Sequence, residues 1–240
     1  MKKDTLTQLQ TEIKHYTEEK LLPFWIQRTI DREKGGYLTH FNEFGEDSGT
    51  DEKSLIAQTR SVFTYSQAYR HGFGGEIMKS MAEHGVAYLL EKMWDKENGG
   101  FYWMMDRDGN PTNKQKIGYG HSFVIYSLSE YTLATGDPIG LEYAEKTFDL
   151  LQKYAVDTNY GGYWEFFSPT WELMGPGPGG GDRKTLDVHM HLMEAFTTLY
   201  EASGKEIHRR KLKESIDILI QKIMHSEFGT GIPQFWADWT

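Results

Sequence analysis

A glycine turn that recurs at near-constant spacing constrains the fold of this chain more than any other feature of its sequence. An acidic residue is followed by two glycines and an aromatic residue in Asp31-Arg-Glu-Lys-Gly-Gly-Tyr37, Asp95-Lys-Glu-Asn-Gly-Gly-Phe101 and Asp157-Thr-Asn-Tyr-Gly-Gly-Tyr163. The first glycines of these copies lie 64 and then 62 residues apart, and a degraded copy, Glu227-Phe-Gly-Thr-Gly231, follows 68 residues after the third. Such a period is typical of proteins built from repeated supersecondary units.

The segments between the turns each carry two helical patterns. Apolar residues recur at helical spacing over 54–69 and 76–94, over 123–133 and 141–151, and over 188–202 and 212–224. The opening segment predicts one more helix, over 5–22, which ends before Pro23. Each unit is therefore expected to be a helix pair closed by a turn in which glycine adopts a positive φ.

The two helices of each predicted pair differ in composition. The first is rich in small and aromatic residues and nearly free of lysine, as in SVFTYSQAY, whereas the second has charged stripes, as in EYAEKTFDLLQKY. This contrast predicts an inner and an outer layer, and it favours a closed ring of helix hairpins over an open solenoid. Six pairs of about 63 residues would need close to 400 residues, so we expect residues 1–240 to be the N-terminal portion of one all-α domain, with seven to eight helices.

The composition argues against several classes of function. The net charge of −9 and the sequence pI of about 5.5 disfavour nucleic acids and anionic membranes as partners. The absence of cysteine excludes disulfides, thiolate metal sites and a cysteine nucleophile. No apolar run follows the N-terminal lysines, and none approaches the roughly 20 residues of a membrane span, so we predict a cytoplasmic protein.

Polar residues mark the starts of the predicted inner helices, which a ring would bring to one mouth. They are Arg60 on the first helix, Tyr119 and His121 on the second, and Asp187, His189 and His191 on the third. Arginine and aspartate can hold sugar hydroxyls, and imidazole transfers protons near neutral pH. The set therefore predicts a site for a polyol.

Each candidate also has a structural interpretation. Arg60 could form a surface ion pair, Tyr119 could belong to the core, and His121 or Asp187 could cap a helix. His189 and His191 are two residues apart and point about 200° away from each other on a helix, so only one can face the lumen together with Asp187. His191, four residues after Asp187, is the preferred catalytic residue.

Two further features were considered as ligand sites. Asp187 and His191 could bind a divalent ion, but the sequence identifies no further fixed ligand, so we predict neither a metal nor a cofactor. The glycine-rich loop 175–181 lacks the Lys-Ser/Thr that a phosphate-binding loop requires and is interpreted as a lid or linker. Four tryptophans could either stack on a sugar ring or belong to the core: Trp164, Trp171, Trp236 and Trp239.

The segment KTLDVHMHLMEAFTTLYE at 184–201 resembles the N-acylglucosamine 2-epimerase family, in which Lys-Thr-x-Asn/Asp-x-His-x-His-x-x-Glu-Ala recurs. The chain is also similar to this family at Tyr119-Gly-x-Ser-Phe123, at Gln58-x-Arg60 and at the Gly-Gly-aromatic turns. The resemblance covers the whole chain in order. It implies an (α/α)6 barrel of about twelve helices, of which this chain would hold the first seven or eight.

The resemblance also implies a reaction. Members interconvert free sugars by proton transfer at C2 through a cis-enediolate, without a cofactor, and the two flanking histidines belong to later inner helices that this chain does not contain. By their matching motifs, Arg60 and Tyr119 would bind substrate oxygens, and Asp187 would hold a hydroxyl. His191 would lie near the reacting carbons or assist ring opening, and His121 and His189 remain further candidates for substrate binding. Cellobiose 2-epimerases usually have Asn at the position of Asp187, which favours a monosaccharide such as mannose or glucose.

Two other classes of function remain as alternatives. An (α/α)-barrel glycoside hydrolase would need two catalytic carboxylates, for which Asp187 and Glu165 are the candidates. A helical-repeat binding module would need a polar concave surface. We expect these 240 residues alone to be inactive, and we expect exposed inner-helix surface to cause dimerisation or self-association.

Overall fold

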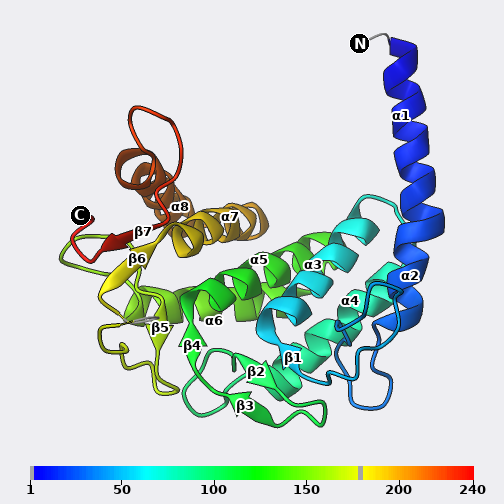
Figure 1. The fold of residues 1–240 in the computed structure, drawn as a ribbon, viewed down its shortest axis with the longest axis horizontal. Helices are drawn as coiled ribbons and strands as arrows, with labels where there is room; N and C mark the ends of the chain where they lie inside the picture. The colour runs from blue at the N-terminus through cyan, green and yellow to red at the C-terminus, as the bar shows by residue number, and fades with distance from the viewer. Residues whose placement is uncertain (1–2, 178–180) are drawn as a thin grey trace.

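The computed structural model describes residues 3–177 and 181–240, which form an arc of two helical layers (Figure 1). The inner layer consists of α3 (Leu55–Arg70), α5 (Gly118–Thr135) and α7 (Leu186–Ser203). The outer layer consists of α4 (Glu76–Tyr88), α6 (Pro138–Tyr154) and α8 (Glu206–Ile218). Helix α5 packs between α3 and α7, and each inner helix packs on the outer helix that follows it. The predicted helix pairs and layers are confirmed.

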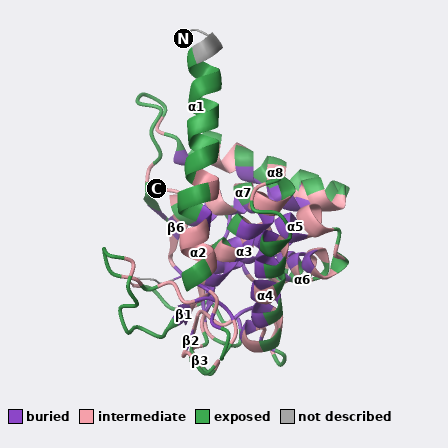
Figure 2. Ribbon diagram, turned by 90° about the vertical axis from the view of Figure 1, so that its right-hand side faces the viewer, coloured by how far each residue is buried: buried purple, intermediate pink, exposed green. Residues whose placement is uncertain are grey.

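Burial explains why the two layers differ in composition. The central helix α5 is buried over most of its length (Figure 2), and its small residues, Ser and Gly, allow its neighbours to approach closely, while its aromatic side chains fill the space between the helices. The outer helices bury only one face, for example Ala144, Phe148 and Leu151 on α6. Left-handed glycines end the inner helices, at Gly136 after α5 and Gly204 after α7.

The N-terminal helix differs from its prediction. We expected it to end at Leu22 before Pro23, but it continues from α1 (Lys3–Tyr16) through a π-helical turn (Thr17–Leu21) into α2 (Leu22–Arg28). A proline inside an α-helix lacks one N–H donor and clashes with the carbonyl four residues earlier. The wider π turn directly before Pro23 accommodates that missing bond, so the helix does not break. Similar π turns, Leu89–Met93 and Leu219–Ile223, extend α4 and α8.

Short strands that the sequence analysis did not predict lead into the inner helices. They form the sets β1 (Lys53–Ser54) with β2 (Met104–Met105) and β3 (Pro111–Asn113), β4 (Lys116–Ile117) with β5 (Phe166–Phe167), and β6 (Arg183–Thr185) with β7 (Gln234–Trp236). In each set, the strand before an inner helix pairs antiparallel with a segment from the next repeat. These pairings tie consecutive repeats together at the helix N-termini.

A buried ion pair anchors each of the first three glycine turns to the strand that leads into the next inner helix. The lysine Nζ atoms lie 2.8 Å from a carboxylate oxygen in Lys53–Asp31, 2.9 Å in Lys116–Asp95 and 2.6 Å in Lys184–Asp157. The fourth turn has the same backbone hydrogen bonds, with His225 rather than Glu227 at the position of the acidic residue. The acidic residue of the turn is therefore the partner of a buried lysine, which its spacing alone did not reveal.

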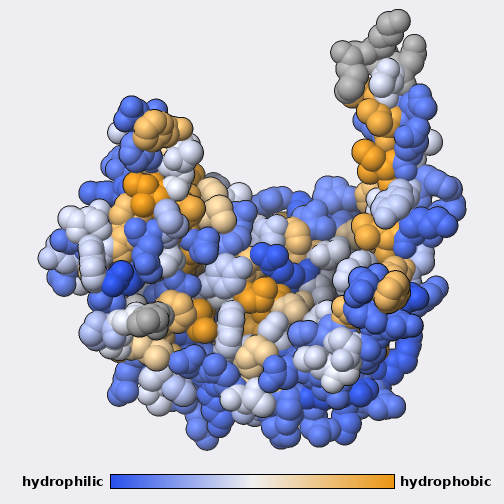
Figure 3. Space-filling view, viewed as in Figure 1, coloured by the Kyte–Doolittle hydropathy of each residue, from blue (hydrophilic) through white to orange (hydrophobic). Residues whose placement is uncertain are grey.

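The N-terminal helix α1 projects from the arc, and its described side chains from residue 5 onward are exposed (Figures 1 and 2). Leu6, Leu9, Ile13 and Tyr16 form an apolar stripe along it, part of which is visible in Figure 3. In the described part of the chain, no helix is both long and apolar enough to cross a membrane.

Candidate functional site

Two of the predicted site histidines are structural. His121 and His189 are buried, with exposed fractions of 0% and 1%. In each, Nδ1 donates to the carbonyl oxygen four residues earlier, Ile117 at 2.8 Å or Thr185 at 2.7 Å. Each Nε2 accepts a hydrogen bond from the backbone N–H of the turn aromatic, Phe101 or Tyr163, at 3.0 Å. Both ring nitrogens are thus occupied, and the structure does not bring these two candidates for substrate binding to the concave face. Of His189 and His191, which were expected not to face the lumen together, His191 lies there.

Two of the four tryptophans cover these histidines. The Trp171 ring centroid lies 5.0 Å from that of His121, and Trp239 lies 5.1 Å from His189. Both tryptophans adopt a positive φ, 68° and 71°, which is strained for a residue with a side chain. Through their contacts with His121 and His189, Trp171 and Trp239 pack over the glycine turns. Trp236 lies under the guanidinium of Arg183, 3.6 Å from its ring centroid to Cζ.

The inner helices line an open cavity of about 290 Å3 on the concave side of the arc. It is lined by Arg60, Phe63 and Thr64 from α3, Phe123 and Tyr126 from α5, and His191 and Glu194 from α7. Charged, imidazole, hydroxyl and aromatic groups from three consecutive repeats converge here. Small-molecule sites commonly combine an apolar lining with a few convergent polar groups.

Arg60, Tyr119 and His191 come together through the ring of Phe123. The guanidinium carbon of Arg60 lies 4.5 Å above the Phe123 ring centroid, a cation–π contact. The His191 ring lies 4.6 Å from Phe123 and 5.2 Å from Tyr119, centroid to centroid. The structure therefore brings together these three predicted site residues, although they are separated by up to 131 positions in the sequence.

The phenol of Tyr126 places a neutral hydroxyl on the cavity wall. Tyr126 stacks on Phe63 at 3.9 Å between ring centroids. Burial and the nearby negative charges of Glu194 and Glu130 raise the pKa of Tyr126 to about 12. Its phenol stays protonated at neutral pH and can donate a hydrogen bond. On α7, His191 Nδ1 lies 2.7 Å from the carboxylate of Glu194.

The two carboxylates considered for glycoside hydrolysis lie near the N-terminus of α7 and do not line the cavity. Asp187 is exposed in the first turn of this helix. Glu165 is buried, and its Oε2 accepts a hydrogen bond of 2.7 Å from the hydroxyl of Thr185. Burial and the charge of Asp187 raise the pKa of Glu165. Both carboxylates lie outside the cavity in which Arg60 and His191 meet, so Asp187 does not face it together with His191 as expected.

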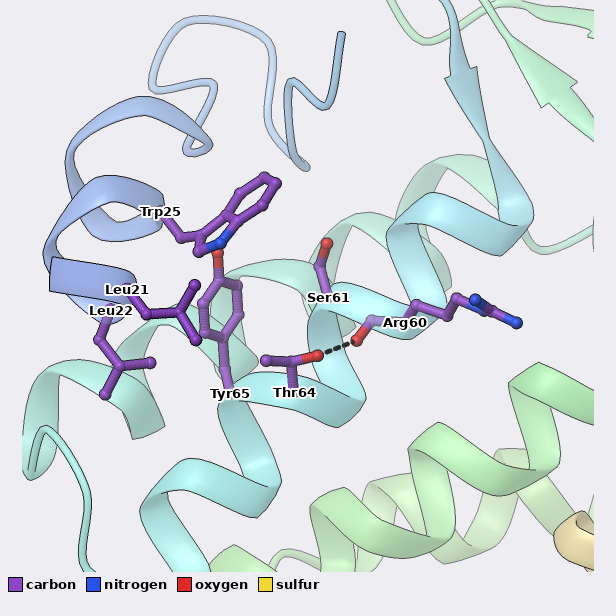
Figure 4. A pocket seen from close by; sticks show the side chains of 7 residues that line it. All are labelled: Leu21, Leu22, Trp25, Arg60, Ser61, Thr64 and Tyr65. Carbon is purple, nitrogen blue, oxygen red and sulfur yellow. Dashed lines mark hydrogen bonds between the residues drawn. The ribbon is translucent and has the colours of Figure 1, made fainter. Parts of the chain in front are cut away.

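A second cavity, of about 250 Å3, lies between the N-terminal helix and α3 (Figure 4). Leu21, Leu22, Trp25 and Tyr65 make it mostly apolar, and the Arg60 guanidinium points away from it. The hydroxyl of Thr64 donates to the Arg60 carbonyl at 2.9 Å, so the helix backbone already uses this polar group. The first cavity is therefore the better match for a ligand with many hydroxyls.

Across the described ranges 3–177 and 181–240, no cluster of three or more His, Asp or Glu side chains could hold a metal ion. The glycine-rich loop interpreted as a lid includes residues 178–180, which lie outside these ranges.

Residues 36–240 match the model of the N-acylglucosamine 2-epimerase (GlcNAc 2-epimerase) family. The chain belongs to this family. It is 32% identical over 235 residues to a cellobiose 2-epimerase of Bacteroides fragilis, covering 96% of this chain and 60% of that protein. It is 30% identical over 196 residues to a D-mannose isomerase of Marinomonas mediterranea, covering 81% and 47%. The chain thus spans about 60% or less of the length of these family members.

Solved structures of the same family confirm the expected (α/α)6-barrel fold. The cellobiose 2-epimerase of Spirochaeta thermophila superposes with a TM-score of 0.90 at 29% identity, over 99% of this chain and 59% of that one. A family 76 glycoside hydrolase of Bacteroides thetaiotaomicron superposes with a TM-score of 0.67 at 12% identity, a likeness of fold alone. The arc of α3, α5 and α7 therefore corresponds to part of the inner ring of such a barrel.

Several lining residues were not among the predicted site residues. They are Phe63, Thr64, Phe123, Tyr126 and Glu194. Each lies three, four or seven positions after a predicted site residue on its own helix, which places it on the same face. Extending each predicted position along its helical stripe would have found the cavity wall.

Proposed function

We propose that this chain contributes the sugar-binding part of an enzyme that interconverts free sugars by proton transfer at C2, and that the described cavity holds the sugar. The observation that carries the proposal is the convergence of Arg60, Tyr126, His191 and Glu194 from three inner helices around about 290 Å3. A guanidinium and a neutral phenol donate hydrogen bonds to sugar oxygens, and a carboxylate accepts them from hydroxyls. The relatives named above are a cellobiose 2-epimerase and a D-mannose isomerase, and their names agree with this chemistry.

The proposed roles follow the geometry. Arg60 would bind an oxygen of the open-chain sugar, where its charge would stabilise the negative oxygen of a cis-enediolate. Tyr119, in contact with His191, would bind a further hydroxyl. His191 would assist ring opening or contact the reacting carbons, since an imidazole transfers protons near neutral pH. Asp187, which is exposed in the first turn of α7 and lies outside the cavity, would bind a sugar hydroxyl from there.

The substrate we propose is a monosaccharide of the mannose or glucose type. The cavity volume suits one sugar ring, and the aspartate at position 187 differs from the asparagine usual in cellobiose 2-epimerases. Two-sided proton transfer at C2 needs two groups that flank the carbon. Among the described side chains, His191 is the one histidine that lines the cavity. We therefore propose that the 240 residues bind the sugar without completing the reaction.

Proton NMR in D2O with mannose, glucose and cellobiose tests both parts of the proposal. Saturation transfer from the protein to mannose or glucose, lost in R60A, would support the site. We expect the C2 proton signal to persist with this chain and to disappear with any longer product of the same gene that adds a second proton-transferring group. Failure of all three sugars to bind, or binding that R60A does not change, would refute the assignment of the cavity.

A further inference from the structure

Glu194 lies one helical turn after His191 on α7, and its Oε2 is 2.7 Å from Nδ1 of the histidine. The exposed fractions differ: 15% for the His191 side chain and 46% for that of Glu194. The imidazole is therefore sheltered, whereas the carboxylate keeps contact with solvent and needs no buried counter-charge. This arrangement permits the carboxylate to hold a ring hydrogen without a large desolvation cost.

The orientation of the His191 ring is set from two directions. Phe123 and Tyr119 on α5 contact it at 4.6 and 5.2 Å between ring centroids. The Phe123 ring is in turn contacted by the guanidinium of Arg60, whose Cζ lies 4.5 Å from the ring centroid. Aromatic contacts restrict the ring plane, but they do not determine which nitrogen carries the proton. The Glu194 carboxylate, which can only accept, requires a hydrogen on Nδ1.

The buried histidines offer an internal comparison. In His121 and His189, the acceptor at Nδ1 is a backbone carbonyl, and Nε2 accepts a backbone N–H. In His191, a carboxylate takes the place of the carbonyl, and Nε2 has no hydrogen-bond partner within the described residues. The pattern at Nδ1 is retained while the second nitrogen is free, as proton transfer requires.

We infer that Glu194 is a positioning residue that holds His191 as its Nδ1–H tautomer, so that Nε2 is the basic nitrogen presented to the ligand. The role of Nε2 toward a ligand rests on the proposed function, whereas the tautomer of His191 can be measured without any activity. A carboxylate in this place also stabilises the imidazolium that forms when Nε2 accepts a proton.

Long-range 1H–15N spectra of the 15N-histidine-labelled chain test the inference directly. They are recorded well above the ordinary histidine pKa of about 6.5, and the His191 signals are identified by their loss in H191N. We expect the wild type to show the Nδ1–H form. E194Q should retain it, because the amide oxygen accepts the same bond, whereas E194A should lose it in favour of the Nε2–H form.

Glu201→Ala is the matched control, because Glu201 is another exposed glutamate of α7 whose carboxylate binds Arg70 and no histidine. It should leave the His191 tautomer unchanged. An Nε2–H form in the wild type, or an Nδ1–H form that survives in E194A, would overturn the inference. A tautomer change in E194A together with no sugar binding by the wild type would uphold the inference and refute the proposed function.

Discussion

The Nε2 atom of His121 accepts a hydrogen bond of 3.0 Å from the backbone N–H of Phe101, which fastens a glycine turn to the helix that follows it. His189 makes the same contact with Tyr163 in the next repeat. In the first repeat, Gln58 takes this place, with its Oε1 2.8 Å from the backbone nitrogen of Tyr37. A neutral amide and a neutral imidazole therefore perform one structural task in consecutive repeats.

This equivalence predicts how stability depends on pH. Burial lowers the pKa of His121 to about 3 and that of His189 to about 4. As pH falls, these two imidazoles are therefore protonated in the unfolded chain before they are protonated in the folded one. Their stabilising effect is complete above the unfolded pKa of about 6.5 and is lost as pH falls towards the folded values. From pH 7.5 to 5.5, about 2–3 kcal/mol of unfolding free energy should be lost through the two groups. Urea denaturation at both pH values measures it.

The variant H121Q/H189Q is the control for this effect, because glutamine already serves at position 58. It should remove most of the loss of unfolding free energy between pH 7.5 and 5.5 and leave only the contribution of other groups, such as His208, whose pKa burial also lowers. Equal pH dependence in the wild type and the double variant would contradict the assignment of neutral, buried imidazoles.

Adjacent glycines in the third turn should respond differently to alanine. Both have a positive φ, 74° at Gly161 and 83° at Gly162. A Cβ at Gly161 would meet no atom within 4 Å, whereas at Gly162 it would lie 2.6 Å from Trp239 and 2.7 Å from His189. G161A should cost about 1–2 kcal/mol through backbone strain, and G162A about 1–3 kcal/mol more through overpacking. Equal losses on urea denaturation would show that the histidine and tryptophan do not close on the turn.

Removing only the lysine of the buried ion pair in the second turn should lower the free energy of unfolding more than replacing both partners. Burial alone would raise the pKa of Asp95, but hydrogen bonds from Lys116 and two backbone amides hold it at about 2. Lys116→Met leaves that carboxylate buried without its cation and should cost about 3–5 kcal/mol. The double variant D95N/K116M should recover part of the loss, which a thermodynamic cycle from urea denaturation would show. A double variant less stable than K116M would rule out this account.

Arg60 should control sugar affinity through both its charge and its planar shape. R60A is expected to weaken mannose binding about 10- to 100-fold, the range for losing a hydrogen bond from a charged group. R60K retains the charge but loses the stacking over Phe123, so it should restore only part of the affinity. Titration calorimetry measures both, with R209A on the exposed face of α8 as the control. Full affinity in R60A would exclude a direct contact with the sugar.

We propose that the exposed apolar stripe on α1 drives self-association of this chain. Leu6, Leu9, Ile13 and Tyr16 lie on one face of the helix, with exposed fractions of 41–65%. Ile13→Lys places a charge in the middle of the stripe and should lower the mass found by light scattering after sizing chromatography. Gln8→Lys, on the opposite face of the same helix, should leave it unchanged. A wild-type chain that is monomeric at every concentration would refute the proposal.

Much of the architecture could be predicted from the sequence, because local patterns carry it. The spacing of the glycine turns and the helical periodicity between them predicted the alternation of inner and outer helices, which the structure confirms. The end of the N-terminal helix was predicted wrongly, since a proline signals a break but does not reveal that a π turn will absorb it. The short strands were missed because two or three residues have no periodicity to detect.

The repeat, the helix pairs and the set of candidate site positions could all be found from the amino-acid sequence. Which of the equivalent residues face a ligand depended on tertiary packing, because His121 and His189 are buried against glycine turns whereas His191 lies on the concave face beside Glu194. The physical reason is that a histidine at the start of an inner helix can either satisfy a buried backbone N–H or face a ligand. That choice depends on which turn from the preceding repeat packs against it, a contact between residues 20 or more positions apart.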